Sequence, residues 1–279
     1  MRRAIWQVAA CAALVAAAGC GSDDAESAAA GGPSGDMLLA TTTSTQDSGL
    51  LDVLVPAFES GSACTVKPVA VGSGDAMAMG EKGNADVLLV HSPADEREFM
   101  AEGHGSSRAA VMHNDYVLVG PPSDPAGVAK ADDAVEAMEM IAQAKAPFAS
   151  RADESGTNTK ELDMWNEAGV DPQGSWYIET GQGMGETLVI ADQKQAYTLS
   201  DRGTFLATGS LESEIVFDGS PDLLNWYHVI VVDHAGTNVG CAKEFAGWLQ
   251  EESVQKMIGN FGVEEYGRQL FHPDALGRG

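Results

Sequence analysis

Three short segments rich in serine, threonine and glycine carry the side chains best suited to bind a small anion. They are residues 41–45 (TTTST), 72–74 (GSG) and 150–157 (SRADESGT), and each follows an apolar run and precedes a helical pattern. At such strand-to-helix junctions an open α/β sheet collects its ligands, and the helix N-terminus offers N–H donors and a partial positive charge. The hydroxyls add donors, so the three segments together predict an anion-binding cradle. Taken singly, each is also compatible with an ordinary N-cap and turn.

Arg151 is the sharpest single candidate for a ligand-binding residue. It immediately follows the predicted strand at 148–150 and is flanked by small residues that leave room for a ligand. A guanidinium donates in a planar fork and keeps its charge at any physiological pH, which suits an oxyanion. The alternative is a salt bridge to a neighbouring carboxylate, of which Asp153 and Glu154 are the nearest in sequence.

The patterns of the common catalytic and cofactor sites are missing from the sequence. Residues 181–185 (GQGMG) lack the Lys-Ser/Thr ending of a P-loop and the spacing of a dinucleotide fingerprint, so they indicate either a tight turn or a backbone donor near a ligand. No GxSxG motif is present, and the six histidines show no metal-ligand spacing. We therefore expect no catalytic residue, no metal and no cofactor. An enzyme acting on a phosphorylated or sulfated substrate is a remote alternative.

The elements that must position these residues alternate between strand and helix. Pro56 is expected to kink or end the first helix early, and Asp201 to cap a helix that begins at Arg202. The alternation predicts an α/β fold with mainly parallel sheets. The expected strands are 37–42, 66–71, 85–90, 116–120, 148–150, 175–178, 196–199 and 227–232, and the other expected helices are 50–58, 75–81, 93–102, 132–144, 158–168, 185–193 and two within 238–259.

The first 36 residues have the pattern of export and tethering segments. Arg2 and Arg3 precede an apolar stretch of secretory-signal length that ends in AAGC at 17–20. This predicts a lipoprotein signal peptide over 1–19, a lipid on Cys20, and a flexible polar tether over 20–36. The expected location is the periplasmic or extracellular face of the membrane. Cleavage near Ala18 without lipid attachment is the alternative.

The charge and the remaining cysteines restrict the possible partners. The chain has 41 acidic and 16 basic residues and a net charge of −25, and it becomes more negative when the signal segment is removed. Such a chain lacks the basic stripe that nucleic acids or anionic lipids require. Cys64 and Cys241 remain once Cys11 and Cys20 are assigned to the signal and the anchor, and they either form a disulfide or stay as two buried thiols.

Several blocks in their order resemble the family of tungstate-binding proteins of ABC importers (TupA type). They are LLATTTSTQDSGLLDVLVPAFE, VGSGDAMAMGEKGNADVLLVHSPADE, MHNDYVLVGPPSDPAG, APFASRADESGTNTKELDMWNEAG, GSWYIETGQGMGETL and AYTLSDRGT, which together cover nearly all of residues 38–205. The segment NWYHVIVV and the late helix around Trp248 are similar but less distinctive. Cys64 and the pronounced acidity are departures, and neither affects the site motifs.

The resemblance implies a two-lobed periplasmic-binding-protein type II fold with the ligand cleft between the lobes. Lobe I would comprise 37–119 and 228–279, and lobe II would comprise 120–227. The implied partners are tungstate and the permease and ATPase subunits of an importer, with the chain itself a monomer. Carried onto this sequence, the family's oxyanion-binding residues are Thr42, Thr43, Ser44, Ser73, Arg151 and Ser155, with Thr198 a weaker candidate.

Physical chemistry alone leaves the ion open. Tungstate and molybdate have nearly the same size and charge, and only the resemblance favours tungstate. Sulfate remains possible, and phosphate, which keeps a proton at neutral pH, would need an acceptor such as Asp47 or Asp153. A sensor or structural lipoprotein with a vestigial cleft is a further alternative.

Overall fold

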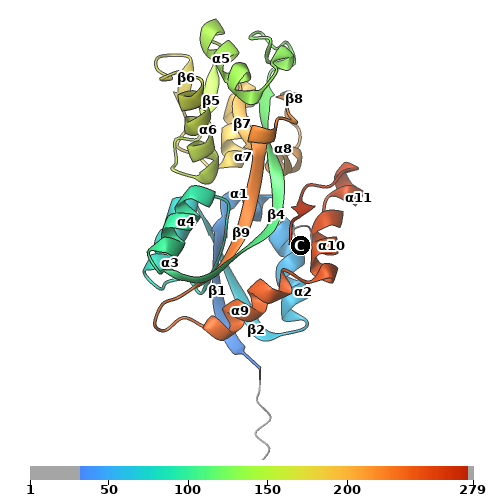
Figure 1. The fold of residues 1–279 in the computed structure, drawn as a ribbon. Helices are drawn as coiled ribbons and strands as arrows, with labels where there is room; N and C mark the ends of the chain where they lie inside the picture. The colour runs from blue at the N-terminus through green and yellow to red at the C-terminus, as the bar shows by residue number, and fades with distance from the viewer. Residues whose placement is uncertain (1–31, 276–279) are drawn as a thin grey trace, which may run out of the picture. The chain divides into compact units, whose positions relative to one another are not determined.

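A curled sheet with helices on both faces forms the larger part of the fold in the computed structural model, which describes residues 32–275 (Figure 1). In this sheet β1 pairs in parallel with β2 and β3, whereas β9 pairs antiparallel with β3 and β4. The strands are β1 (Ser34–Thr42), β2 (Ala63–Val71), β3 (Val87–Val90), β4 (Gly105–Gly120), β9 (Leu224–Val232) and β10 (His272–Pro273).

The helices around this sheet begin at the junctions predicted from the sequence. The chain leaves β1 into α1, β2 into α3 and β3 into α4, so three helix N-termini lie at one edge of the sheet. The helices are α1 (Thr43–Asp47), α2 (Leu50–Glu59), α3 (Ser73–Glu81), α4 (Pro93–Ala101), α9 (Val239–Trp248), α10 (Glu252–Asn260) and α11 (Val263–Tyr266).

The middle of the chain builds a second group of elements on the far end of β4. Residues Tyr116–Val119 of β4 pair with β7, and β8 pairs with the same end of β4. A short parallel pair, β5 with β6, lies beside β7 through the main-chain bond from Ala149 N to Tyr197 O. These elements are a 3-10 turn (Val128–Lys130), α5 (Ala134–Ala144), β5 (Phe148–Ser150), α6 (Gly156–Glu167), β6 (Tyr177–Glu179), α7 (Met184–Lys194), β7 (Thr198–Asp201), α8 (Arg202–Thr208), β8 (Glu214–Phe217) and a 3-10 turn (Pro221–Leu223).

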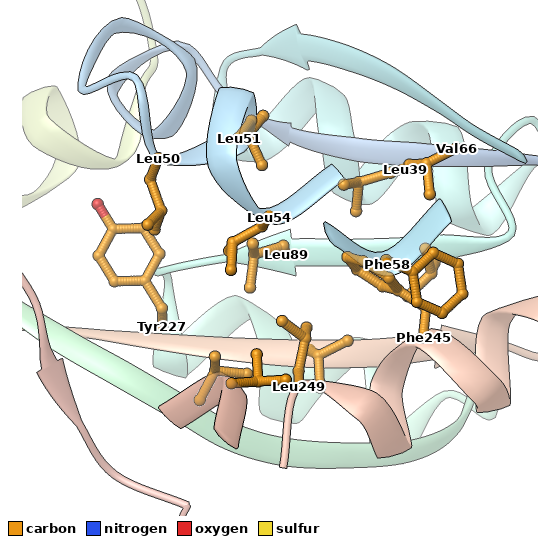
Figure 2. Packing of buried hydrophobic residues seen from close by; sticks show 14 of the residues in the cluster. Leu39, Leu50, Leu51, Leu54, Phe58, Val66, Leu89, Tyr227, Phe245 and Leu249 are labelled. Atoms are coloured by element: carbon orange, nitrogen blue, oxygen red, sulfur yellow. The ribbon is translucent and has the colours of Figure 1, made fainter. Parts of the chain in front are cut away.

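Separate apolar cores hold the two groups of elements. On one face of the large sheet, α2 and α9 pack Leu54, Phe58 and Phe245 against strand residues such as Leu39 and Leu89 (Figure 2). The other group is centred on Phe148 and Trp165, whose rings meet edge to face with 5.1 Å between centroids. Burial of aromatic side chains of this size contributes a few kcal/mol each. The strand-to-helix junctions are therefore held by elements that are firmly packed on these cores.

The structure confirms the predicted α/β class, and Asp201 caps α8 as expected by accepting a hydrogen bond from Thr204 N. The expectation for Pro56 was wrong where it ended the helix early, because α2 continues to Glu59. Pro56 and Asp52, whose carbonyl would have received the missing N–H, both lie on the exposed side of α2, where water can serve that carbonyl.

Cys64 and Cys241 form a disulfide, with 5.7 Å between their Cα atoms, which resolves the alternative left open by the sequence. Within the described residues, no helix is both long and apolar enough to span a bilayer. The signal peptide, the lipid on Cys20 and residues 20–31 of the predicted tether lie outside the described residues, whereas its last residues, 34–36, form the start of β1.

Candidate functional site

The three predicted junctions meet in the structure. A Cβ atom built on Gly156 would lie 2.8 Å from Ser73 Oγ, and one on Gly72 would lie 3.8 Å from the Cα of Ser155. The second junction, at the start of α3, therefore contacts the third, at the start of α6. Arg151 Nη2 donates to Thr43 Oγ1 at 3.3 Å, which joins the third junction to the first.

The first junction places hydroxyls close together at the carboxyl end of β1. Thr42 Oγ1 lies 3.2 Å from Ser44 Oγ and 2.7 Å from Thr45 Oγ1. Thr42 and Ser44 are each 3% exposed, so their hydroxyls are taken out of bulk solvent. Buried hydroxyl groups have few possible hydrogen-bond partners within the protein. The O–H donors that are not used among these hydroxyls are available to an anion.

Ser73 and Ser155 differ in how their hydroxyls are used. Ser155 Oγ caps α6 by accepting from Asn158 N at 3.2 Å, which is the structural role that the sequence left open. Ser73 Oγ is buried and has no hydrogen-bond partner among residues 32–275. Because buried polar groups are nearly always paired, an unpaired hydroxyl at the meeting point of two helix N-termini fits an anion.

Arg151 is buried and sits in the centre of this arrangement. Its side chain is 3% exposed, and its Nη2 lies 2.6 Å from Asp153 Oδ2. Asp153 Oδ1 in turn accepts from Ser155 N at 3.2 Å. The salt bridge considered as an alternative therefore exists, and it orients the guanidinium toward Thr43 rather than into solvent.

Thr198 occupies a different position from the other predicted residues. It is the first residue of β7, at the end of the strand remote from the α8 junction, and its hydroxyl donates to Ala149 O at 2.8 Å. Its hydrogen bond is thus to the neighbouring strand, and it contributes to holding β5 in place. Residues 181–183 form the turn before α7, where Gly181 N donates to Arg151 O.

His91 was missed by the sequence analysis. It directly follows β3, and its Nδ1 lies 3.2 Å from Tyr116 Oη while its Nε2 lies 3.5 Å from Ser44 Oγ. Burial lowers the pKa of His91 to about 4, so the ring is neutral at pH 7. The signal that could have found it is the junction between the predicted strand 85–90 and the predicted helix 93–102.

Two cavities are bordered by residues at or near these junctions. One of about 210 Å³ lies beside Gly156 and is bordered by His91, Tyr116 and Lys160. The other, of about 660 Å³, is more open and is bordered by Asp47 and Glu186. Burial, and next the charge of Glu186, raise the pKa of Asp47, while Arg151 opposes the rise. The cavity beside Asp47 and Glu186 is thus acidic, whereas the meeting point holds hydroxyls and a guanidinium paired with Asp153.

Within the described residues there is no group of three or more His, Cys, Asp or Glu side chains placed to hold a metal ion. The donor set consists of hydroxyls, helix N-termini and a guanidinium, which match an anion and not a cation. That the protein needs no cofactor stays a prediction.

The fold and this donor set match the class of solute-binding proteins that take an anion at strand-to-helix junctions. A profile of the PBP superfamily domain matches residues 27–253. The tungstate-binding protein TupA of Peptoclostridium acidaminophilum is 46% identical over 239 residues, which cover 84% of this chain and 84% of the relative. The chain belongs to the PBP superfamily and, within it, to the family of the tungstate-binding proteins.

Solved structures agree with this assignment. The tungstate ABC transporter structure from Geobacter sulfurreducens is 44% identical, with a TM-score of 0.73, and the match covers 81% of this chain and 98% of that one. The tungstate-binding protein TupA from Desulfovibrio alaskensis G20 is 38% identical, with a TM-score of 0.73, over 86% of this chain and 98% of that one. The predicted family and type II fold are thus confirmed.

Proposed function

We propose that this protein captures tungstate outside the cytoplasm and delivers it to an ABC importer. The observation that carries the proposal is the burial of Arg151 at the point where three hydroxyl-bearing junctions meet. Family membership and the printed functions of the relatives support the choice of ion. The finer proposals are that the protein is not an enzyme, needs no cofactor, is monomeric and is anchored by a lipid on Cys20.

The proposed mechanism is replacement of the hydration shell of a doubly charged ion. Hydroxyls of Thr42, Thr43, Ser44 and Ser73 donate to its oxygens, together with the first N–H groups of α3 and α6. Arg151 supplies the compensating positive charge. Thr43 and Ser73 lie on helices of the large sheet, whereas Arg151 and Ser155 belong to the other group of elements, so an ion bound among them would hold the two groups together.

Distant carboxylates do not prevent this binding. The screening length is about 8 Å at physiological ionic strength, so most of the surface charge is weakened at the site. The contacts made by buried donors therefore decide the affinity.

Titration calorimetry with tungstate, molybdate, sulfate and phosphate tests the proposed ligand. We expect tungstate, alone or with molybdate, to bind at least about 100-fold more tightly than sulfate and phosphate, which corresponds to about 2.7 kcal/mol. Equal affinity for all four ions would contradict the choice of ligand. Absence of binding to any of them would contradict the proposed function, and turnover of a phosphorylated or sulfated compound would favour the enzyme alternative.

A further inference from the structure

A fourth strand-to-helix junction lies next to the third, and a carboxyl group caps it. β5 and β7 are neighbours linked by Ala149 N to Tyr197 O and by Thr198 Oγ1 to Ala149 O. Arg151 follows the end of β5, and Asp201 ends β7. The carboxyl ends of parallel neighbours meet at one edge, so the Asp201 side chain lies close to the charge of Arg151.

One oxygen of Asp201 is left without a partner. Oδ1 accepts from Thr204 N at 2.8 Å, which completes the N-cap of α8. Oδ2 is buried and forms no hydrogen bond of normal geometry among the described residues, and neither does Thr204 Oγ1. The Thr204 hydroxyl is near enough to oppose part of the rise in the pKa of Asp201, but it does not give Oδ2 a well-formed bond. The whole residue is 1% exposed. An ionised carboxylate in such a position is costly, because a buried charge needs pairing or hydrogen bonding.

The groups around Asp201 do not neutralise it. Arg151 is the nearby cation, but its guanidinium is bound to Asp153. Arg202, the next residue, is committed to Asp115 and Asp218. Asp47 on α1 adds a like charge to the environment of Asp201.

The aromatic neighbours of the site are not charged at neutral pH. Tyr116 on β4 and Tyr227 on β9 are neutral phenols, and burial raises the pKa of each. His91, after β3, is neutral because burial lowers its pKa to about 4. On α7, Glu186 acts on Asp47 rather than on Asp201.

We propose that Asp201 takes up one proton when a dianion binds, so that the occupied site holds no carboxylate charge at this junction. This inference rests on the proposed function. An ionised Asp201 would repel the dianion, whereas its neutral acid would not and could donate its O–H. Binding therefore selects the protonated form, and affinity is linked to pH.

The direction of the pH dependence follows from the pKa of the free protein. Burial raises the pKa of Asp201 to about 6, and the hydrogen bond from Thr204 and the charge of Arg151 oppose this rise only in part. A bound dianion favours the neutral acid and raises the pKa further. As pH rises above the pKa of the free protein, tungstate affinity should fall by up to about tenfold per pH unit, because a proton must then be recruited.

Calorimetry at pH 7 in two buffers of different ionisation enthalpy, with micromolar sodium tungstate, counts the protons directly. We expect the wild type to take up between about half a proton and one proton per tungstate. Asp201→Asn keeps the shape and a good N-cap. It should reduce the uptake to near zero, make the dissociation constant independent of pH between 6.5 and 8, and bind more tightly than the wild type at pH 8. Asp201→Ser, a shorter capping residue, should likewise remove the uptake.

Asp47→Asn is the matched control. It removes a like charge that helps to raise the pKa of Asp201, so proton uptake should persist, between about half a proton and one proton per tungstate, rather than fall to near zero. Tungstate binding without proton uptake in the wild type overturns the role of Asp201 and leaves the proposed function standing. Persistent uptake in Asp201→Asn assigns the proton to another group, such as Asp47 or His91, and also overturns it. Absence of tungstate binding to the wild type overturns both proposals.

Discussion

Arg151 is the residue on which the anion site depends most directly. It is buried, and its guanidinium donates to Thr43 of the first junction. Without a ligand, its positive charge is compensated by the carboxylate of Asp153. A guanidinium held in this way is pre-oriented, so little entropy is lost when it donates to an oxyanion.

Replacing Arg151 by alanine should raise the dissociation constant for tungstate by at least about 30-fold, because truncating one partner of a buried charged contact costs about 2–5 kcal/mol. Thermal unfolding should show that the variant stays folded, since Arg151 lies outside both apolar cores. The companion variant Asp153→Asn removes the competing carboxylate, and it should bind tungstate as tightly as the wild type or several-fold more tightly. An unchanged dissociation constant in Arg151→Ala would remove this residue from the site.

For single residues, the sequence predicted the hydrogen-bond donors of the candidate site better than the groups that pack around them. Residue type and position after a strand selected Arg151 and the segments 41–45 and 72–74. The resemblance to the family then singled out Thr43 and Ser73, and the structure brings these residues together with Arg151. His91 and the acidic role of Asp201 were missed. A single histidine or aspartate near the start of a helix is not a sequence motif that indicates a functional site. Only packing shows that His91 is buried beside Ser44 and that Asp201 keeps an unpaired oxygen.

Among the elements, α6 is the one whose position decides whether the third junction can contact the second. Its first residue, Gly156, packs so closely that a Cβ atom there would lie 2.8 Å from both His91 Cε1 and Ser73 Oγ. Contacts under 3.0 Å force a neighbour to move. The glycine is therefore required for close approach, and its backbone does not have a positive φ.

Gly156→Ala should weaken tungstate binding by about tenfold or more, because the added methyl group pushes α6 away from α3 and His91. The helix itself should not suffer, since alanine has the better helix propensity. Gly185→Ala on α7 is the control, because a Cβ atom there meets nothing within 4 Å. Calorimetry of both variants checks the expectation. Equal, undiminished affinity in the two would show that the junctions are loosely packed when the ion is bound.

The lengths of the elements show where pattern analysis ends. The sequence predicted a strand at 116–120, whereas β4 extends from Gly105 to Gly120. Residues 105–115 carry Ser, Arg, His and Asn, so they lack an apolar signature, yet β9 pairs with them as a long neighbour. β10 was missed for the same reason, because its two residues carry no strand signature and are held by pairing with β4. β8 was also missed, although its sequence EIVF favours a strand.

For the molecule as a whole, the Cys64–Cys241 disulfide supports a fold that the apolar cores already organise. The two cysteines are 177 residues apart in sequence, and they fix the start of β2 to α9. The boundaries of the two lobes stay a prediction, since both groups of elements share the long strand β4.

The bond lies far from the anion site. Gly35 is the partner of Cys64 in the β1–β2 register, whereas Thr42 is the partner of Val71 at the other end. At about 3.3 Å per residue, that separates the disulfide from the first junction by roughly 20 Å. Stability and binding should therefore respond differently when the bond is removed.

Replacing both cysteines by serine should lower the free energy of unfolding by about 2–5 kcal/mol, because a long loop is no longer closed in the unfolded chain. The dissociation constant for tungstate should change less than about threefold, since no junction is touched. Denaturant unfolding and calorimetry on the same samples measure the two effects, and reduction of the wild type with a phosphine should reproduce them. A large loss of affinity with little loss of stability would mean that the disulfide end of β1 and β2 controls the junctions through the sheet.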